Sequence, residues 1–120
     1  MTEEHPILVI DDDPAILDTV AEMLEFEGYA VQVAANGAEG LAAVERLRPA
    51  LVLLDMRMPV LDGWGFASRL RERGIELPVV VMTAAQDAQR WASDIAATGY
   101  LAKPFEYQEL LSAVRAHIGG

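Results

Sequence analysis

The sequence predicts a single α/β domain, residues 1–120, in which a parallel β-sheet carries helices on both faces. Short apolar runs rich in β-branched residues alternate five times with longer segments of helical period. Strands that alternate with helices in this way form parallel sheets with right-handed crossovers. The length of 120 residues is that of one ordinary domain, which agrees with one core.

The composition narrows the class of protein. The chain is 52% hydrophobic and 23% charged, which is typical of a soluble globular protein, and it has no cysteine for disulfides, thiolate metal sites or nucleophilic catalysis. Its formal net charge of -10 predicts that it does not bind nucleic acid directly. The acidic start at residues 1–6 and the short apolar run behind it predict a cytoplasmic protein without a signal peptide or membrane segment.

The first half of the chain predicts two strand–helix units. A strand is expected at Ile7–Ile10, and it stops at a run of three aspartates. Asp13 is expected to cap the next helix, with Pro14 at its first position and Gly28 at its end. A second strand over 29–34, a turn at Asn36-Gly37 and a helix over 38–47 are expected to follow.

The second half predicts three more units. Leu51–Leu54 and Val79–Met82 are apolar without interruption, the pattern of strands buried on both faces, and they end at Asp55 and Thr83. Trp91 is expected to be partly buried, with exposure on a partner-binding face as the alternative. The other expected elements are a helix through Phe66 and Leu70 that stops by Gly74, a helix through Ala88, Trp91, Ala92 and Ile95, a short strand around Tyr100-Leu101, and a helix carrying Tyr107, Leu110, Leu111, Val114 and Ile118.

The polar residues at the strand ends predict the functional site, because sites in parallel sheets lie at the carboxyl ends of the strands. These residues are Asp11, Asp12, Asp55, Thr83 and Lys103. Three carboxylates in one crevice repel one another unless a cation joins them, and oxygen ligands without His or Cys suit Mg²⁺. The lysine and the hydroxyl supply the charge and the hydrogen-bond donor that a phosphoryl group needs.

Five motifs together resemble the receiver domains of two-component response regulators. They are Ile-Leu-Val-Ile-Asp-Asp-Asp-Pro (7–14), Leu-Leu-Asp-Met-Arg-Met-Pro (53–59), Asp-Gly (62–63), Met-Thr-Ala (82–84) and Gly-Tyr-Leu-Ala-Lys-Pro-Phe (99–105). The resemblance covers nearly the whole chain, in the order and spacing of the family. It implies a flavodoxin-like (βα)5 fold with five parallel strands in the order 2-1-3-4-5.

The resemblance also implies residue roles. Asp55 is expected to accept a phosphoryl group from a histidine kinase or a histidine phosphotransfer protein. Asp11, Asp12, Asp55 and the backbone carbonyl of Arg57 are expected to hold Mg²⁺. Lys103 is expected to pair with Asp55 and then with its phosphate. The chain would assist its own phosphorylation and dephosphorylation, but its role would be signalling rather than enzymatic.

The family also has a conformational switch, which implies roles for Thr83 and Tyr100. The hydroxyl of Thr83 is expected to bond the phosphoryl oxygens, and Tyr100 to move inward. The face of the fourth helix, fifth strand and fifth helix would then bind a downstream protein or a linked effector domain, or dimerise. The Lys103-Pro104 bond is expected to be cis. Ala96 replaces a glycine of the family, which predicts a strain of about 1 kcal/mol if its backbone is left-handed.

Other functions fit the sequence less well. A Mg²⁺-dependent phosphatase with an aspartyl nucleophile needs an Asp-x-Asp motif after the first strand and a cap for the substrate. Here Asp11-Asp12-Asp13 is followed by Pro14, and the five strand–helix units leave no segment for a cap. A flavodoxin-like cofactor binder needs a Ser/Thr/Gly-rich loop after the first strand. A degenerate receiver would bind partners without phosphorylation, but all five key positions carry suitable residues. Arg57 and Ala85 occupy variable positions that help to set the lifetime of the phosphoryl group in this family.

Overall fold

Five strand–helix units follow one another in the computed structural model, which describes residues 5–118. The elements are β1 (Ile7–Ile10), α1 (Pro14–Phe26), β2 (Val31–Ala34), α2 (Gly37–Leu47), β3 (Leu51–Asp55), α3 (Gly63–Glu72), β4 (Val79–Ala84), α4 (Ala85–Asp94), β5 (Gly99–Lys103) and α5 (Tyr107–Ile118). The strands form one parallel sheet in the order β2-β1-β3-β4-β5, which confirms the predicted fold class and strand order. Residues 1–4, in the acidic start, lie outside the described residues.

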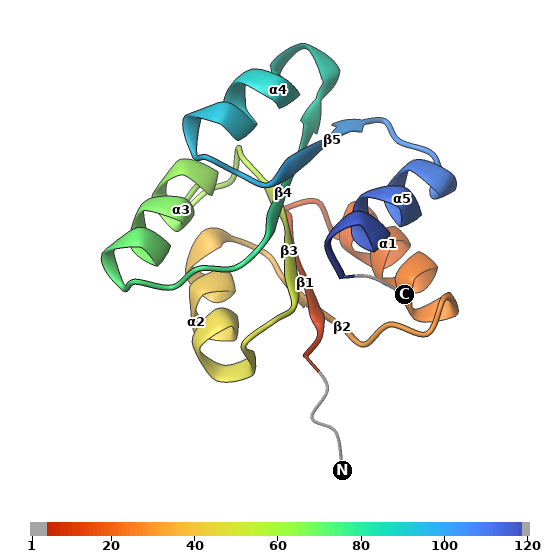
Figure 1. Cartoon of the computed structure of the whole chain (residues 1–120), viewed down its shortest axis with the longest axis horizontal. Coiled ribbons are helices and arrows are strands. Elements are labelled where there is room, and N and C mark those ends of the chain that lie inside the picture. Colours follow the sequence, from red (N-terminus) through yellow and green to blue (C-terminus); the bar gives the residue numbers. More distant parts are fainter. Residues whose placement is uncertain (1–4, 119–120) are drawn as a thin grey trace.

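The sheet separates two apolar cores. Helices α1 and α5 cover one face, and α2, α3 and α4 cover the other (Figure 1). Along β1, Leu8 and Ile10 pack into the core with α2, α3 and α4, whereas Ile7 and Val9 pack into the core with α1 and α5. Because successive strand residues point to opposite faces, a strand between two cores must be apolar at every position.

The start of α2 differs from the prediction. The turn expected at Asn36-Gly37 is wrong, because Asn36 caps α2 and Gly37 is its first residue. The Asn36 side chain accepts from the Glu39 N–H at 2.9 Å, and Glu39 accepts in return from the Ala35 N–H at 3.1 Å. A β-carbon at position 37 would lie 2.4 Å from the backbone oxygen of Leu61, so only glycine fits there. The Asn-x-x-Glu spacing was the signal for this cap.

Most other local features agree with the sequence. Asp13 caps α1 by accepting from the Ala15 N–H at 2.9 Å, and Pro14 is the first residue of the helix. The Lys103-Pro104 bond is cis, as expected, and Ala96 has a left-handed backbone with φ of 53°, which meets the condition for the strain named above. The strand predicted over 29–34 starts only at Val31. No helix within residues 5–118 has the length and apolar character needed to cross a membrane.

Candidate functional site

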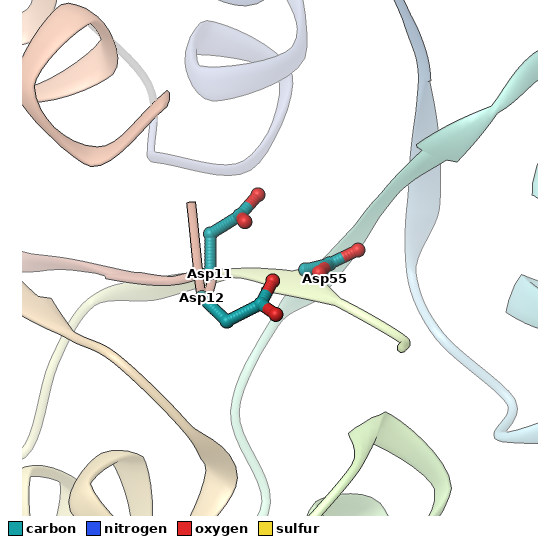
Figure 2. A group of neighbouring side chains, drawn as sticks. All are labelled: Asp11, Asp12 and Asp55. Atoms are coloured by element: carbon teal, nitrogen blue, oxygen red, sulfur yellow. The ribbon is translucent and has the colours of Figure 1, made fainter. Parts of the chain in front are cut away.

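Three carboxylates meet at the carboxyl ends of β1 and the central strand β3. Asp11 and Asp12 directly follow β1, and Asp55 is the last residue of the neighbouring strand β3 (Figure 2). One oxygen from each carboxylate lies within 4.8 Å of the others. Asp11 is 1% exposed and Asp55 is 7% exposed, whereas Asp12 is open to solvent. The site therefore holds two buried carboxylates and one that a solvent ion can reach.

One lysine partly balances these charges. The Nζ atom of Lys103 donates to Oδ2 of Asp11 at 2.7 Å and lies 3.7 Å from Oδ1 of Asp55. Lys103 was expected to pair with Asp55, and it forms this salt bridge, but its nearer partner is Asp11. The other oxygen of Asp11 accepts from the Asp13 N–H at 2.9 Å, so this carboxylate is bonded on both sides. Asp55 accepts at 3.0 Å from the N–H of Met56.

The surroundings of Asp55 raise the pKa of its carboxyl from 3.8 to about 6. Burial is the largest cause, and the charges of Asp11 and Asp12 act in the same direction. Lys103 and the Met56 N–H lower the pKa, but by less than burial and the two neighbouring charges raise it. Clustered carboxylate oxygens with too few cations fit a hard divalent ion such as Mg²⁺. Asp11, Asp12 and Asp55 could therefore hold a metal.

The raised pKa predicts that stability depends on pH. A carboxyl whose pKa is higher in the folded state binds more protons there, so its contribution to stability is lost as pH rises from about 4 to 6. Without metal, we expect the parent to lose about 2 kcal/mol more than Asp55→Asn between pH 4.5 and 7. Urea unfolding of both proteins at both pH values measures this difference. Equal losses would show that Asp55 titrates normally.

The two expected switch residues lie on neighbouring strands. Thr83 is in β4 and is 6% exposed, whereas Tyr100 is in β5 and 49% exposed, so its side chain is outside the core. The register pairs Thr83 with Ala102 and Val81 with Tyr100. Residues two apart in a strand point to the same face. Thr83 and Tyr100 therefore share the face of the sheet that α4 covers, because Val81 packs into the core with Trp91.

The loop after β3 is closed tightly at Gly63. The Gly63 N–H donates to the Met56 carbonyl at 2.9 Å, and a β-carbon at position 63 would lie 2.8 Å from the Met56 Cα. Asp62 caps α3 by accepting from the Gly65 N–H at 2.8 Å. This close approach fixes the loop that carries Arg57, whose carbonyl stays a predicted metal ligand.

An aromatic pair beside this loop was not predicted. The rings of Trp64 and Trp91 lie 5.0 Å apart at an angle of 68°, and the indole N–H of Trp64 donates to Asp94 at 3.2 Å. The guanidinium carbons of Arg57 and Arg90 each lie 5.9 Å from the centre of the Trp91 ring. Trp91 is buried, which agrees with the first of the two expectations for this residue. No sequence pattern predicted its contacts with Trp64, Arg57 and Arg90.

Comparisons with known proteins agree with this geometry. A family model described as the response regulator receiver domain matches residues 7–115. The DNA-binding dual master transcriptional regulator RpaA of Synechocystis is 45% identical over 114 residues, covering 92% of this chain and 47% of RpaA. Response regulator MprA of Mycobacterium leprae is 43% identical over 112 residues, covering 92% and 49%. The chain thus spans about half the length of these curated relatives.

Two solved structures show the same fold over nearly their whole length. Chemotaxis protein CheY4 of Vibrio cholerae has a TM-score of 0.85 at 29% identity, covering 95% of this chain and 98% of that one. The receiver domain of NtrX from Brucella abortus has a TM-score of 0.85 at 31% identity, covering 93% and 97%.

Proposed function

The chain belongs to the response regulator receiver domain family, and we propose that Asp55 accepts a phosphoryl group from a histidine kinase or a histidine phosphotransfer protein. One observation carries the proposal: Asp55 is a buried carboxylate at a strand end, with Asp11, Asp12 and Lys103 around it. With a pKa of about 6, roughly nine tenths of Asp55 is ionised at pH 7, so it is available as a nucleophile.

The proposed reaction is an in-line phosphoryl transfer. An oxygen of Asp55 forms a bond to phosphorus while the bond from phosphorus to the donor imidazole nitrogen breaks, and the product is an acyl phosphate. Catalysis of such a transfer is mainly positioning and charge stabilisation. The position of Lys103 supports this proposal, because its Nζ lies 3.7 Å from Asp55 and is held by Asp11. Water later cleaves the acyl phosphate and restores the carboxylate.

We propose Mg²⁺ as the resident ion of this site. The carboxylates of Asp11, Asp12 and Asp55 would hold it, with the backbone carbonyl of Arg57 as a further ligand. When bound, the ion would neutralise the charge that gathers on the phosphoryl oxygens. The residues fit this ion because they offer only oxygen donors and carry more negative charge than Lys103 balances.

The proposed role is that of a cytoplasmic signalling module rather than an enzyme. The chain would assist its own phosphorylation and dephosphorylation, and the face of α4, β5 and α5 would bind a downstream protein, a linked effector domain or a second copy. The net charge of -10 opposes direct binding of nucleic acid by these residues. The description of RpaA as DNA-binding applies to that whole protein, of which this chain covers 47%.

Labelling with a small phosphodonor tests the proposal. Incubation with acetyl phosphate and Mg²⁺ is expected to add one phosphoryl group, which peptide mass analysis should locate between residues 51 and 62. Chelation of Mg²⁺ should reduce the rate. A modification elsewhere, or none at saturating donor, would contradict the assignment of Asp55.

Thr83→Ala is expected to uncouple the acceptor from the switch face. The hydroxyl can donate to a charged phosphoryl oxygen, an interaction worth about 1.5–3 kcal/mol and thus a population bias of tenfold or more. Beryllofluoride should shift the amide resonances of residues 88–112 in the parent, and in Thr83→Ala the shifts over residues 99–112 should be much smaller. Thr83→Ser keeps the hydroxyl and should respond like the parent. Equal shifts in parent and Thr83→Ala would exclude a path through Thr83.

A further inference from the structure

Two arginines contact the same tryptophan but differ in their other contacts. Arg57 and Arg90 each place their guanidinium carbon 5.9 Å from the centre of the Trp91 ring. Arg90 also binds Asp87 at 2.7 Å, which fixes it to its own helix. Arg57 is exposed and, within residues 5–118, forms no salt bridge, and it lies two positions after Asp55. Arg57 is therefore the cation of this pair that is free to change partners.

We propose that Arg57 is a positioning residue that links the acidic site to α4: an anionic group on Asp55 draws its guanidinium off Trp91 and so loosens the helix. This inference rests on the proposed function, since it requires a phosphoryl group or its analogue on Asp55. It adds a second connection to α4 that does not pass through Thr83.

The charge of the site changes in the direction that the inference needs. Once a divalent ion is bound, its two positive charges and that of Lys103 balance Asp11, Asp12 and Asp55. A phosphoryl group on Asp55 replaces one negative charge by two, so the site becomes net negative. Guanidinium binds phosphoryl oxygens in bidentate geometry. Such a charge-assisted hydrogen bond is stronger than a partly exposed cation–π contact, so Arg57 should leave the ring.

Trp91 is well placed to transmit this change, because α4 depends on it. Trp91 is the only large side chain that α4 buries, beside the small Ala88 and Ala92. The helix begins after Ala84 without a side-chain cap, and Ala96, just beyond its end, has a left-handed backbone. Once Arg57 has left, the Trp91 ring keeps Trp64, Arg90 and its packing in the core, but it loses one of its two cationic neighbours.

Arginine NMR resonances test the first half of the inference with an internal control. Protons above an aromatic ring are shielded by its ring current. In the parent with saturating Mg²⁺, the Nε–H proton of Arg57 should move downfield when beryllofluoride binds, whereas that of Arg90 should stay in place. Arg57→Lys identifies the Arg57 resonance by its loss. Retention of the shielded position by Arg57, with bound beryllofluoride seen by fluorine NMR, would overturn the inference.

Hydrogen exchange tests the second half. Beryllofluoride should increase amide exchange in residues 88–94 of the parent, and Arg57→Gln should lose most of this increase and bind beryllofluoride about tenfold more weakly. Arg90→Gln, a matched change at the same ring, should keep both. An equal increase in Arg57→Gln, or an equal loss in Arg90→Gln, would overturn the link. If the fluorine spectrum of the parent shows no bound beryllofluoride, the proposed function itself fails and the inference falls with it.

Discussion

Replacement of Asp55 by asparagine is expected to reduce phosphoryl labelling to below about one hundredth of the parent level, because an amide oxygen is not a competent nucleophile. The change is nearly isosteric. The Met56 N–H that donates to Asp55 at 3.0 Å can donate to the amide oxygen, and Lys103 keeps its bond to Asp11 at 2.7 Å. The fold should therefore persist, which circular dichroism and thermal unfolding can establish before labelling with acetyl phosphate is measured.

Asp13→Asn is the matched control for this experiment. Asp13 is an exposed aspartate directly next to the acidic cluster, and its side chain caps α1. Asparagine caps helices about as well as aspartate, so the same chemical change should leave both stability and labelling close to the parent. Labelling of Asp55→Asn near the parent stoichiometry would move the acceptor elsewhere. Loss of labelling in Asp13→Asn would mean that the general charge of the region, rather than one nucleophile, controls the reaction.

Mg²⁺ is expected to stabilise the parent by about 2.7 kcal/mol at a concentration one hundred times its dissociation constant. The cause is the relief of repulsion among carboxylates whose oxygens lie within 4.8 Å of one another. Asp12→Ala should lose most of this response, because Asp12 is the member that solvent reaches. The same variant should be at least as stable as the parent without metal, since it removes an unbalanced like charge. Urea unfolding with and without Mg²⁺ measures both effects.

Asp18→Ala is the control for the metal response. Asp18 is an exposed acidic residue of α1 that does not belong to the cluster. Asp18→Ala changes the net charge by the same amount as Asp12→Ala, so this control variant should keep the full stabilisation by Mg²⁺. If the parent does not respond to millimolar Mg²⁺, the carboxylates do not form a metal site. If Asp18→Ala loses the response as well, the ion acts by screening the net charge.

The architecture was predictable because its main signals are strong and local. The uninterrupted runs at Leu51–Leu54 and Val79–Met82 identify strands between two helical layers, and all of these residues are buried. The candidate site was predictable from strand ends alone, since parallel strands bring their carboxyl ends to one edge. The structure places Asp11, Asp12 and Asp55 together there, with Lys103 between two of them.

Other features depend on distances that no sequence pattern contains. Lys103 lies nearer to Asp11 than to Asp55 because of the path of a long, flexible side chain from β5. Gly37 begins α2 because of a backbone contact with Leu61, which is distant in the sequence. The contact of exposed Arg57 with buried Trp91 joins the loop after β3 to α4, two segments that are distant in the sequence. A lysine, a glycine or an arginine can contact many different partners, and the packing of the folded chain determines which contact forms.

The burial of like charges has a consequence for laboratory evolution of this protein. A screen for heat resistance in metal-free buffer would reward substitutions that remove the charge of Asp12 or Asp55, so asparagine at position 55 should be among its first products. Variants with asparagine at position 55 would no longer carry the phosphoryl acceptor. A screen with Mg²⁺ present would instead penalise loss of a ligand, and selection for robustness and selection for signalling would then point to the same sequences.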